Sequence, residues 1–401
     1  MRILRFFGVL VLIVVVLAVV QMVRGVPSPS VSLQAAGKTV PGPSPRLPWP
    51  ASGEAAIAVQ GIGPMGSYGG TASMPIGSVA KVMTALLVLE KHPLTLGQQG
   101  PSITMTQADV LTYQQDAVTH QSYVAVAAGE KLTEYQLLEG LLVPSGNNFA
   151  RILAHWVGGS QAQFVQMMNA KAKALGLRHT TYADASGLSA LTVSDAQDQL
   201  RLAEIAMQNP VFAQIVAEPQ VSLPSPEGLV YNYNKEIGHT IGRDMVIGVK
   251  TGSTLAAGGC YVFAMQRNIA GKNVIVYGAV FGAGGLYPLD TAISEGTTLG
   301  TAALNAVEPV HVVQSGSQVA SLTAPWQGSV GVKTSQALQF YGWGGLPVKL
   351  SLQAKTLKAP VPVGSDVGRL HVQVGHQTQS VRLQSTGAVQ SPSLRWRLLR
   401  L

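Results

Sequence analysis

The sequence contains few cysteine, charged and aromatic residues, and these shortages exclude or disfavour particular structures and partners. Its one cysteine, Cys260, lies in the apolar stretch 260–264, so no disulfide forms within the chain and a small buried side chain is the favoured interpretation. Charged residues make up 11% of the sequence, against about 25% in ordinary soluble domains. No basic run with interleaved aromatic residues occurs in the body of the chain, which argues against a nucleic-acid partner.

Length and net charge indicate the number of domains and the kind of surface that the protein faces. The 401 residues are enough for two or three domains with ample core. The formal net charge is +8, which suits a protein that faces anionic membrane or cell-wall polymers.

The first 24 residues have the pattern of a membrane-spanning or signal segment. Arg2 and Arg5 precede an apolar run over residues 6–23 that only Gln21 interrupts. The basic flank predicts a cytoplasmic N-terminus and an extracytoplasmic remainder. No small-x-small cleavage site follows, so we favour an uncleaved anchor over residues 1–24. The alternative is a cleaved signal, which would leave the protein secreted.

Composition divides the rest of the chain into four parts. Residues 25–52 are rich in Pro, Ser and Gly and predict an extended linker. Residues 53–306 show helical patterns, two of which open with predicted capping boxes at Thr133–Gln136 and Ser160–Gln163, followed by strand patterns over 246–251, 260–266 and 273–281. This order predicts an α+β domain with a mostly antiparallel sheet. Residues 307–388 predict a small all-β domain with short strands over 310–313, 338–343, 348–353, 370–374 and 378–383. The basic and apolar tail, 389–401, is a candidate for contact with a membrane surface; a last strand and a loose tail are both open.

The first candidate catalytic residues lie in the segment 77–90, whose apolar residues recur at the spacing of a helix. Ser78 lies in the first turn of the predicted helix, and Lys81 follows three residues later on the same face. A serine hydroxyl is a weak nucleophile until a neighbouring base takes its proton, and an uncharged lysine is such a base. The alternative role for Ser78 is that of a helix N-cap, although a capping box would require Glu or Gln in the place of Lys81.

Two further motifs follow Ser78-Val79-Ala80-Lys81 in the chain. Ser145-Gly146-Asn147 lies on a predicted turn between two helices, and Lys250-Thr251-Gly252 ends a predicted strand. Each pattern occurs once. Any one of them alone is weak, but the three in this order, each in a suitable context, are a strong signal.

The ordered motifs resemble those of the penicillin-recognising serine enzymes, in particular the D-alanyl-D-alanine carboxypeptidase family of low-molecular-weight penicillin-binding proteins. The segment 137–148, the loop 183–188 and the strand 248–252 are also similar to that family. The resemblance covers about residues 55–305. It implies a β-lactamase/transpeptidase-like catalytic domain, in which helices flank an antiparallel sheet, followed by a small all-β domain.

The resemblance implies a role for each motif residue and no cofactor or metal. Ser78 would attack the penultimate D-alanine of a peptidoglycan stem peptide, with Lys81 as its base and Ser145 relaying the proton to the leaving amine by bridging Lys81 and Lys250. Penicillins and other β-lactam antibiotics would acylate the same serine. Burial and a second cation would keep Lys81 uncharged despite an ordinary pKa of about 10.4. The residues implied in substrate binding are Asn147, Lys250, Thr251, Gly252 and Ser253, and the backbone N–H groups of Ser78 and Ser253 would form the oxyanion hole.

The sequence departs from the family pattern at three places. Asn148-Phe149 stands where Asp-Ala is common, and Ser253 stands where some relatives carry His. Many members place an arginine after the strand that ends near residue 283, whereas residues 283–290 contain none. We therefore expect the substrate carboxylate to depend on Lys250 and Thr251, with Arg243 and Arg267 as the alternatives.

Two other functions are compatible with this fold. A common serine β-lactamase uses a glutamate in a Glu-x-x-Leu-Asn context between the second and third motifs. The four glutamates in that interval lack this context; they are Glu204, Glu218, Glu227 and Glu236. A catalytically weak wall-binding protein is the third interpretation; the complete motif set argues against it and the missing arginine argues for it.

Overall fold

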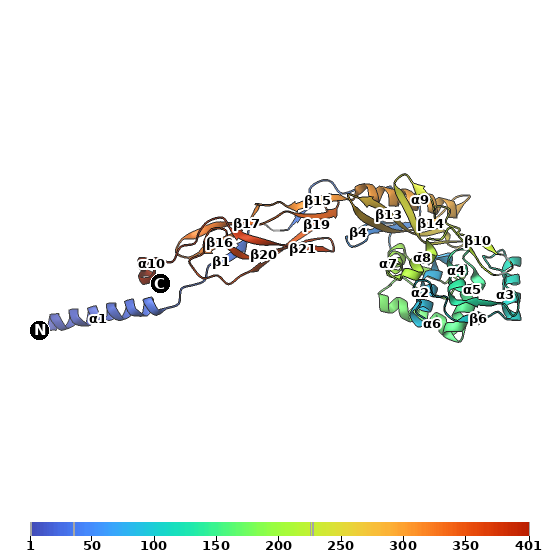
Figure 1. Ribbon diagram of the computed structural model, residues 1–401, viewed down its shortest axis with the longest axis horizontal. Coiled ribbons are helices and arrows are strands. Elements are labelled where there is room, and N and C mark those ends of the chain that lie inside the picture. The colour runs from blue at the N-terminus through green and yellow to red at the C-terminus, as the bar shows by residue number, and fades with distance from the viewer. Residues whose placement is uncertain (1, 35–36, 225, 227, 401) are drawn as a thin grey trace. The chain divides into compact units, whose positions relative to one another are not determined.

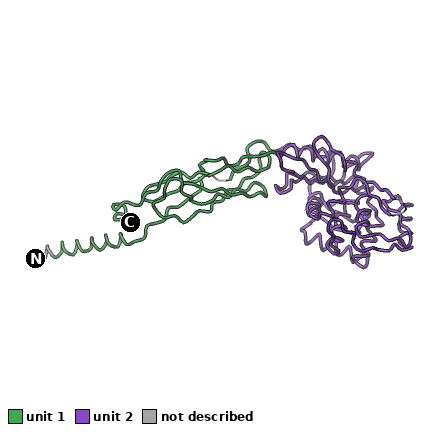
Figure 2. The backbone as a smooth tube through the Cα atoms, viewed as in Figure 1, with its two compact units in different colours: residues 1–44, 308–401 green, residues 45–307 purple. Residues whose placement is uncertain are grey.

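The structure is a computed structural model that describes residues 2–34, 37–224, 226 and 228–400. The chain forms two compact units (Figure 2). One comprises residues 45–307, and the other joins residues 1–44 to residues 308–401. Glu227, one of the glutamates considered above, lies outside the described residues.

A six-stranded antiparallel sheet organises the unit 45–307. The strands lie in the order β11-β12-β13-β14-β3-β4. The predicted strands over 246–251, 260–266 and 273–281 are confirmed, and each extends further because tight turns join them into hairpins. The bounds are β3 Glu54–Val59, β4 Gly63–Tyr68, β11 Thr240–Ile241, β12 Asp244–Thr254, β13 Gly258–Ile269 and β14 Lys272–Ala283.

Helices cover this sheet (Figure 1). Helix α9 (Pro288–Ala306) packs against β13 and β14, and α7 (Ala196–Ala206) packs against β14 and β3. The apolar side of α2 (Lys81–Lys91) is buried among the other helices of the unit. These helices are α3 Gln107–Val118, α4 Glu134–Leu142, α5 Asn147–Gly158, α6 Gln161–Leu175 and α8 Pro210–Val216. Three two-stranded pairs complete the unit: β5 Met74–Pro75 with β8 Val193–Ser194, β6 Ser102–Thr104 with β7 Lys131–Thr133, and β9 Gln220–Ser222 with β10 Leu229–Tyr231.

Capping explains where two of the predicted helices begin. At α4, the Thr133 hydroxyl accepts from the backbone N–H of Gln136, and the Gln136 side chain accepts from the backbone N–H of Thr133. This is the predicted capping box. At α6, Ser160 caps the first turn and Gly176 ends the helix with φ of 72°. Helix α3 was not predicted, because its apolar residues do not form one buried stripe.

The second unit is built on a seven-stranded sheet, in the order β1-β16-β17-β21-β20-β19-β2, with β15 and β18 as a separate pair. Five of its strands match predicted ones. Strands β16 and β17 form a hairpin that the sequence interpretation missed. The bounds are β15 Glu308–Val313, β16 Gln318–Ala324, β17 Gly328–Thr334, β18 Leu338–Gly342, β19 Pro347–Ala354, β20 Asp366–Val374 and β21 Gln377–Ser385.

The interpretation of residues 25–52 as a linker is wrong for part of that segment. Strand β1 (Ser30–Leu33) pairs with β16, and β2 (Lys38–Thr39) pairs with β19. Val40 is 2% exposed and its N–H donates to the Leu346 carbonyl. The segment therefore adds both edge strands to the sheet of the C-terminal residues, a pairing across almost 300 residues that local composition does not reveal.

The tail is also different from both alternatives, because Leu394–Leu399 forms a short helix, α10, capped by Ser393. Arg397 and Arg400 donate to backbone carbonyls at the end of α1 (Arg2–Val23) and just beyond it. Basic side chains at a helix C-terminus satisfy carbonyls that lack helical partners. Within the described residues, α1 is the one helix long and apolar enough to cross a membrane, over Arg5–Val23.

Candidate active site

Ser78 and Lys81 meet at the junction of two helical segments. Residues Gly77–Ala80 form a 3₁₀ turn, and α2 continues from Lys81. Ser78 is half-buried and Lys81 is fully buried. The Ser78 Oγ lies 2.7 Å from the Lys81 Nζ. The turn therefore places the hydroxyl within hydrogen-bond distance of the amine.

The Lys81 amine has three polar neighbours, and their chemistry suits an uncharged lysine. Besides Ser78 Oγ, Nζ contacts the Asn147 Oδ1 at 2.6 Å and the Ser186 carbonyl oxygen at 3.0 Å. Two of these atoms only accept hydrogen bonds, whereas a hydroxyl also donates. A neutral amine has two N–H donors and one lone pair. It matches this set if Ser78 donates its proton to the lone pair.

The pKa shifts of the two buried lysines also favour an uncharged Lys81. Burial, and next the nearby positive charge of Lys250, hold the pKa of Lys81 well below its ordinary value, while Asp184 opposes the shift. Burial also lowers the pKa of Lys250 to about 7. Lys250 is 2% exposed, and its Nζ donates to the Thr251 carbonyl at 3.2 Å.

The second motif lies on the turn before α5. Ser145 is 2% exposed and has φ of 63°, a left-handed conformation that is uncommon outside glycine. Among the described residues its hydroxyl has no hydrogen-bond partner. The expected bridge between Lys81 and Lys250 is therefore not formed in this structure, although the hydroxyl is free to make new hydrogen bonds.

Asn147 is held by protein groups on both sides of its amide. Its Oδ1 accepts from Lys81, and its Nδ2 donates to the Gln121 Oε1 at 3.0 Å. Gln121 precedes Ser122, whose carbonyl accepts the Asn147 backbone N–H. The amide therefore positions Lys81 here, and of the two N–H donors on the Asn147 Nδ2 one is used by Gln121.

The third motif runs along β12 beside the 3₁₀ turn. A Cβ at Gly252 would lie 2.7 Å from the Ile76 carbonyl oxygen and 2.9 Å from the Ser78 backbone nitrogen. These are rigid backbone atoms, so only glycine lets the strand approach the turn this closely. A Cβ on Gly77 would lie 3.1 Å from the Ser253 nitrogen. The backbone N–H groups of Ser78 and Ser253, which are predicted to form the oxyanion hole, therefore lie on two neighbouring backbone segments.

Neither alternative arginine lies near this strand end. Arg267 is 8% exposed and makes two hydrogen bonds to the carboxylate of Asp244, with Nε–Oδ1 at 2.5 Å and Nη2–Oδ2 at 2.9 Å. Arg243 adjoins Asp244 at the start of β12. Lys250 is six residues further along, about 20 Å away at the rise of a strand.

The loop 183–188, which the sequence analysis found similar to the family but gave no role, supplies a contact to Lys81. The Asp184 carboxylate accepts from the Ser186 hydroxyl at 2.6 Å and from the Leu188 backbone N–H at 2.9 Å. This pins the turn whose Ser186 carbonyl accepts from Lys81. Gly187, with φ of 81°, fits because a Cβ there would lie 1.8 Å from the Gly77 carbonyl oxygen. The segment Asp-x-Ser-Gly carries the signal of such a turn, but only the fold brings it to Lys81.

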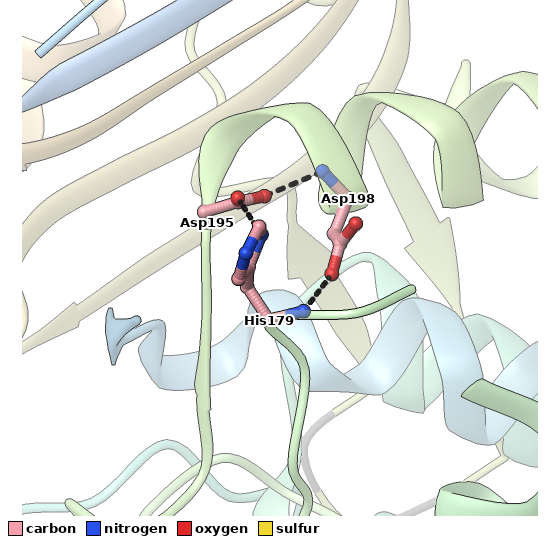
Figure 3. A group of neighbouring side chains, drawn as sticks. All are labelled: His179, Asp195 and Asp198. Atoms are coloured by element: carbon pink, nitrogen blue, oxygen red, sulfur yellow. Dashed lines mark hydrogen bonds and ion pairs between the residues drawn. The ribbon is translucent and has the colours of Figure 1, made fainter. Parts of the chain in front are cut away.

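A group of metal-binding residue types lies at the start of α7 (Figure 3). The His179 Nδ1 is 2.6 Å from the Asp195 Oδ2, and the Asp198 Oδ2 accepts from the His179 backbone N–H at 2.8 Å. Asp195 also caps α7 by accepting from the Asp198 backbone N–H. Each carboxylate is thus engaged in holding α7 to the preceding loop, and helix capping accounts for the arrangement.

The fold and the residues gathered at Ser78 define the class. A helix-flanked antiparallel sheet that sets Ser-x-x-Lys against a Lys-Thr-Gly strand is the architecture of a serine peptidase of the penicillin-recognising class. The family model described as D-alanyl-D-alanine carboxypeptidase matches residues 69–283. The chain belongs to this family, and the predicted α+β fold is confirmed. The family match does not favour the β-lactamase interpretation.

Individual relatives agree with this assignment. The chain is 37% identical over 221 residues to the D-alanyl-D-alanine carboxypeptidase DacB2 of Mycobacterium tuberculosis, covering 53% of this chain and 70% of the relative. It is 30% identical over 261 residues to a D-alanyl-D-alanine endopeptidase of Pseudomonas aeruginosa, covering 62% and 79%. The crystal structure of penicillin binding protein 5 from Haemophilus influenzae has a TM-score of 0.60 at 20% identity and covers 87% of this chain and 100% of its own, a likeness of fold alone.

Proposed function

We propose that this protein removes the terminal D-alanine from peptidoglycan stem peptides through an acyl-enzyme on Ser78, and that penicillins acylate the same residue. The observation that carries the proposal is the contact set of Lys81, in which two acceptors and one hydroxyl surround a buried amine. In the first step Lys81 takes the Ser78 proton while Oγ attacks the carbonyl of the penultimate residue. The backbone N–H groups of Ser78 and Ser253 stabilise the oxyanion, each contributing a factor of about 10²–10³.

Collapse of the tetrahedral intermediate releases D-alanine. The proton held by Lys81 passes to the leaving amine through Ser145, whose hydroxyl has no partner among the described residues. Water then attacks the acyl-enzyme and regenerates Ser78. Lys250 and Thr251 bind the substrate carboxylate, and Gly252 lets β12 lie directly against the serine turn, which keeps the Ser253 N–H close to the Ser78 N–H. Asn147 donates the second N–H of its Nδ2 to the substrate amide carbonyl.

The experiment measures two rates on purified protein. D-alanine release from a stem-peptide mimic and hydrolysis of a penicillin are followed for wild type and Ser78→Ala. The proposal expects release of D-alanine by wild type alone, with slow penicillin turnover. Rapid penicillin hydrolysis would indicate a β-lactamase, and neither activity would indicate a wall-binding protein. A cross-linked dimeric peptide, tested in parallel, distinguishes carboxypeptidase from endopeptidase action.

We also propose that α1 is retained as a membrane anchor with both units on the cell-wall side. The helix is long and apolar enough for this and none of its spanning window is buried, properties that a signal sequence shares. The contacts of Arg397 and Arg400 with the end of α1 support an anchor, because they join the C-terminal helix to a segment that cleavage would remove. N-terminal sequencing of the membrane fraction decides the question; a mature start between Gly25 and Ala35 would overturn the anchor.

A further inference from the structure

The positive charge of the chain is concentrated in the non-catalytic unit. Residues 1–44 and 308–401 contain thirteen Lys and Arg against two acidic residues, a net charge of +11. Residues 45–307 contain fourteen basic and seventeen acidic residues, a net charge of −3. Without Arg2, Arg5 and Arg24, which lie in or next to the proposed anchor, the non-catalytic unit still has a net charge of +8. The electrostatic attraction of the extracytoplasmic part for polyanions therefore originates in this unit and not in the unit that holds Ser78.

Part of this charge lies on one exposed face of the sheet. Strands β17, β21, β20 and β19 are neighbours, and residues paired across them share a face. Alternate residues such as Leu370 and Val381 are buried, so the intervening residues point outward. We call these outward residues the polar face. Residues that pair across the strands form four rows on it. From one end to the other, the rows are Lys333, Gln384 and Asp366, then Arg382, Arg369 and Gln353, then Ser380, His371 and Ser351, and last Thr378, Gln373 and Lys349.

Two arginines stand directly opposite each other on the polar face. Arg369 pairs with Arg382 across β20 and β21, and both are exposed. Among the described residues neither guanidinium has a hydrogen bond or an ion pair, although Arg382 is near enough to Asp366 to lower the pKa of that carboxyl. Asp366 itself is bonded to Lys355 at 2.7 Å. Like charges directly opposite destabilise strand pairing, so the fold gains nothing from this pair.

The side chains on the polar face indicate which kind of anion it would bind. Its cations alternate with amide, hydroxyl and imidazole groups, and its rows contain no Leu, Ile, Val, Phe or Trp. Insertion into a membrane surface requires apolar side chains, and single-stranded nucleic acid requires aromatic platforms. A glycan that carries carboxylates requires both hydrogen-bonding groups for its hydroxyls and cations for its charges. We propose that the polar face binds an extended, carboxylate-bearing glycan chain.

Binding of a carboxylated glycan is tested on the full chain in neutral detergent micelles, with polygalacturonate as the probe and dextran as the uncharged control. The test variant is Arg369→Gln with Arg382→Gln. The matched control is Lys38→Gln with Arg178→Gln, two exposed cations elsewhere; Lys38 pairs with the buried Val348 and so lies on the opposite face of the sheet. Loss of two exposed ionic contacts raises Kd for the polymer by about three- to thirtyfold. It also makes binding less dependent on salt.

A variant that keeps both charges, Arg369→Lys with Arg382→Lys, should bind within about threefold of wild type, and all variants should release D-alanine from a small peptide at the wild-type rate. That activity rests on the proposed catalytic site, so its loss would count against that site and not against the polar face. Three results would overturn the proposal. The first is that the Gln variant and its matched control bind the polymer equally. The second is that the protein binds dextran as tightly as polygalacturonate. The third is that the Gln variant differs from wild type only in its partitioning to micelles that contain anionic lipid.

Discussion

Gly252→Ala tests how closely the strand must approach the serine turn. The new Cβ would lie 2.7 Å from the Ile76 carbonyl oxygen, 2.9 Å from the Ser78 nitrogen and 3.1 Å from the Val79 nitrogen. All three are backbone atoms, so β12 and the turn must separate by about 0.8 Å to restore ordinary contact distances of about 3.5 Å. This displaces both N–H groups of the predicted oxyanion hole.

We expect kcat/KM for a D-Ala-D-Ala peptide, and the rate of penicillin acylation, to fall by about a hundredfold, the effect of losing one oxyanion donor. Gly252 has no left-handed φ, so alanine adds no strain of its own, but its overlap with rigid backbone atoms should lower stability by about 1–3 kcal/mol, and the rates are therefore compared at a temperature where both proteins stay folded. Gly284→Ala is the matched control, because a Cβ there meets nothing within 4 Å. If Gly252→Ala retained activity within threefold of wild type while Gly284→Ala did the same, the close approach of β12 would have no catalytic role.

Three further predictions follow from charge and hydrogen bonding. The penicillin acylation rate, measured by stopped flow, should fall as pH is lowered through the depressed pKa of Lys81, because protonation removes the base; a rate that rises toward acid pH contradicts this. Thr251→Val should raise KM for a D-Ala-D-Ala peptide about ten- to a hundredfold with acylation by a neutral ester little changed, and an unchanged KM would remove Thr251 from the carboxylate pocket. Burial raises the pKa of Glu134 to about 7, so the native state binds a proton that the unfolded state releases above pH 4.5, and stability falls as pH rises from 4.5 to 7. Glu134→Gln should remove that loss, at most ~3 kcal/mol, and thermal midpoints at pH 5 and 8 that shift in parallel for both proteins would refute it.

Sequence reasoning succeeded where the information is local. The capping box at Thr133 determines where α4 begins, and the structure confirms it. The apolar stripe over residues 77–90 predicts a helix there, and the structure has a 3₁₀ turn over Gly77–Ala80 followed by α2 over Lys81–Lys91. The Ser-x-x-Lys spacing also specifies its own contact, because one helical turn brings Lys81 to Ser78. Such features depend on residues within about one turn of each other, so a single sequence contains them.

Features that depend on distant residues were not predicted. Gln121 contacts Asn147, and Ser186 contacts Lys81 from 105 residues away; no local pattern identifies either partner. Composition alone predicts a linker at strand β1, because its partner β16 is nearly 300 residues later. Arg267 was a plausible carboxylate ligand in the sequence, whereas the fold places it against Asp244 at the far end of the strand.

Mapping of a penicillin adduct tests the central claim most directly. The protein is incubated with a fluorescent penicillin, digested, and the labelled peptide is sequenced by mass spectrometry, with Ser78→Ala and Ser145→Ala treated alongside. The account predicts one stoichiometric adduct on Ser78, no labelling of Ser78→Ala, and slower labelling of Ser145→Ala at the same site. Labelling of Ser78→Ala, or an adduct on Ser145, would contradict it.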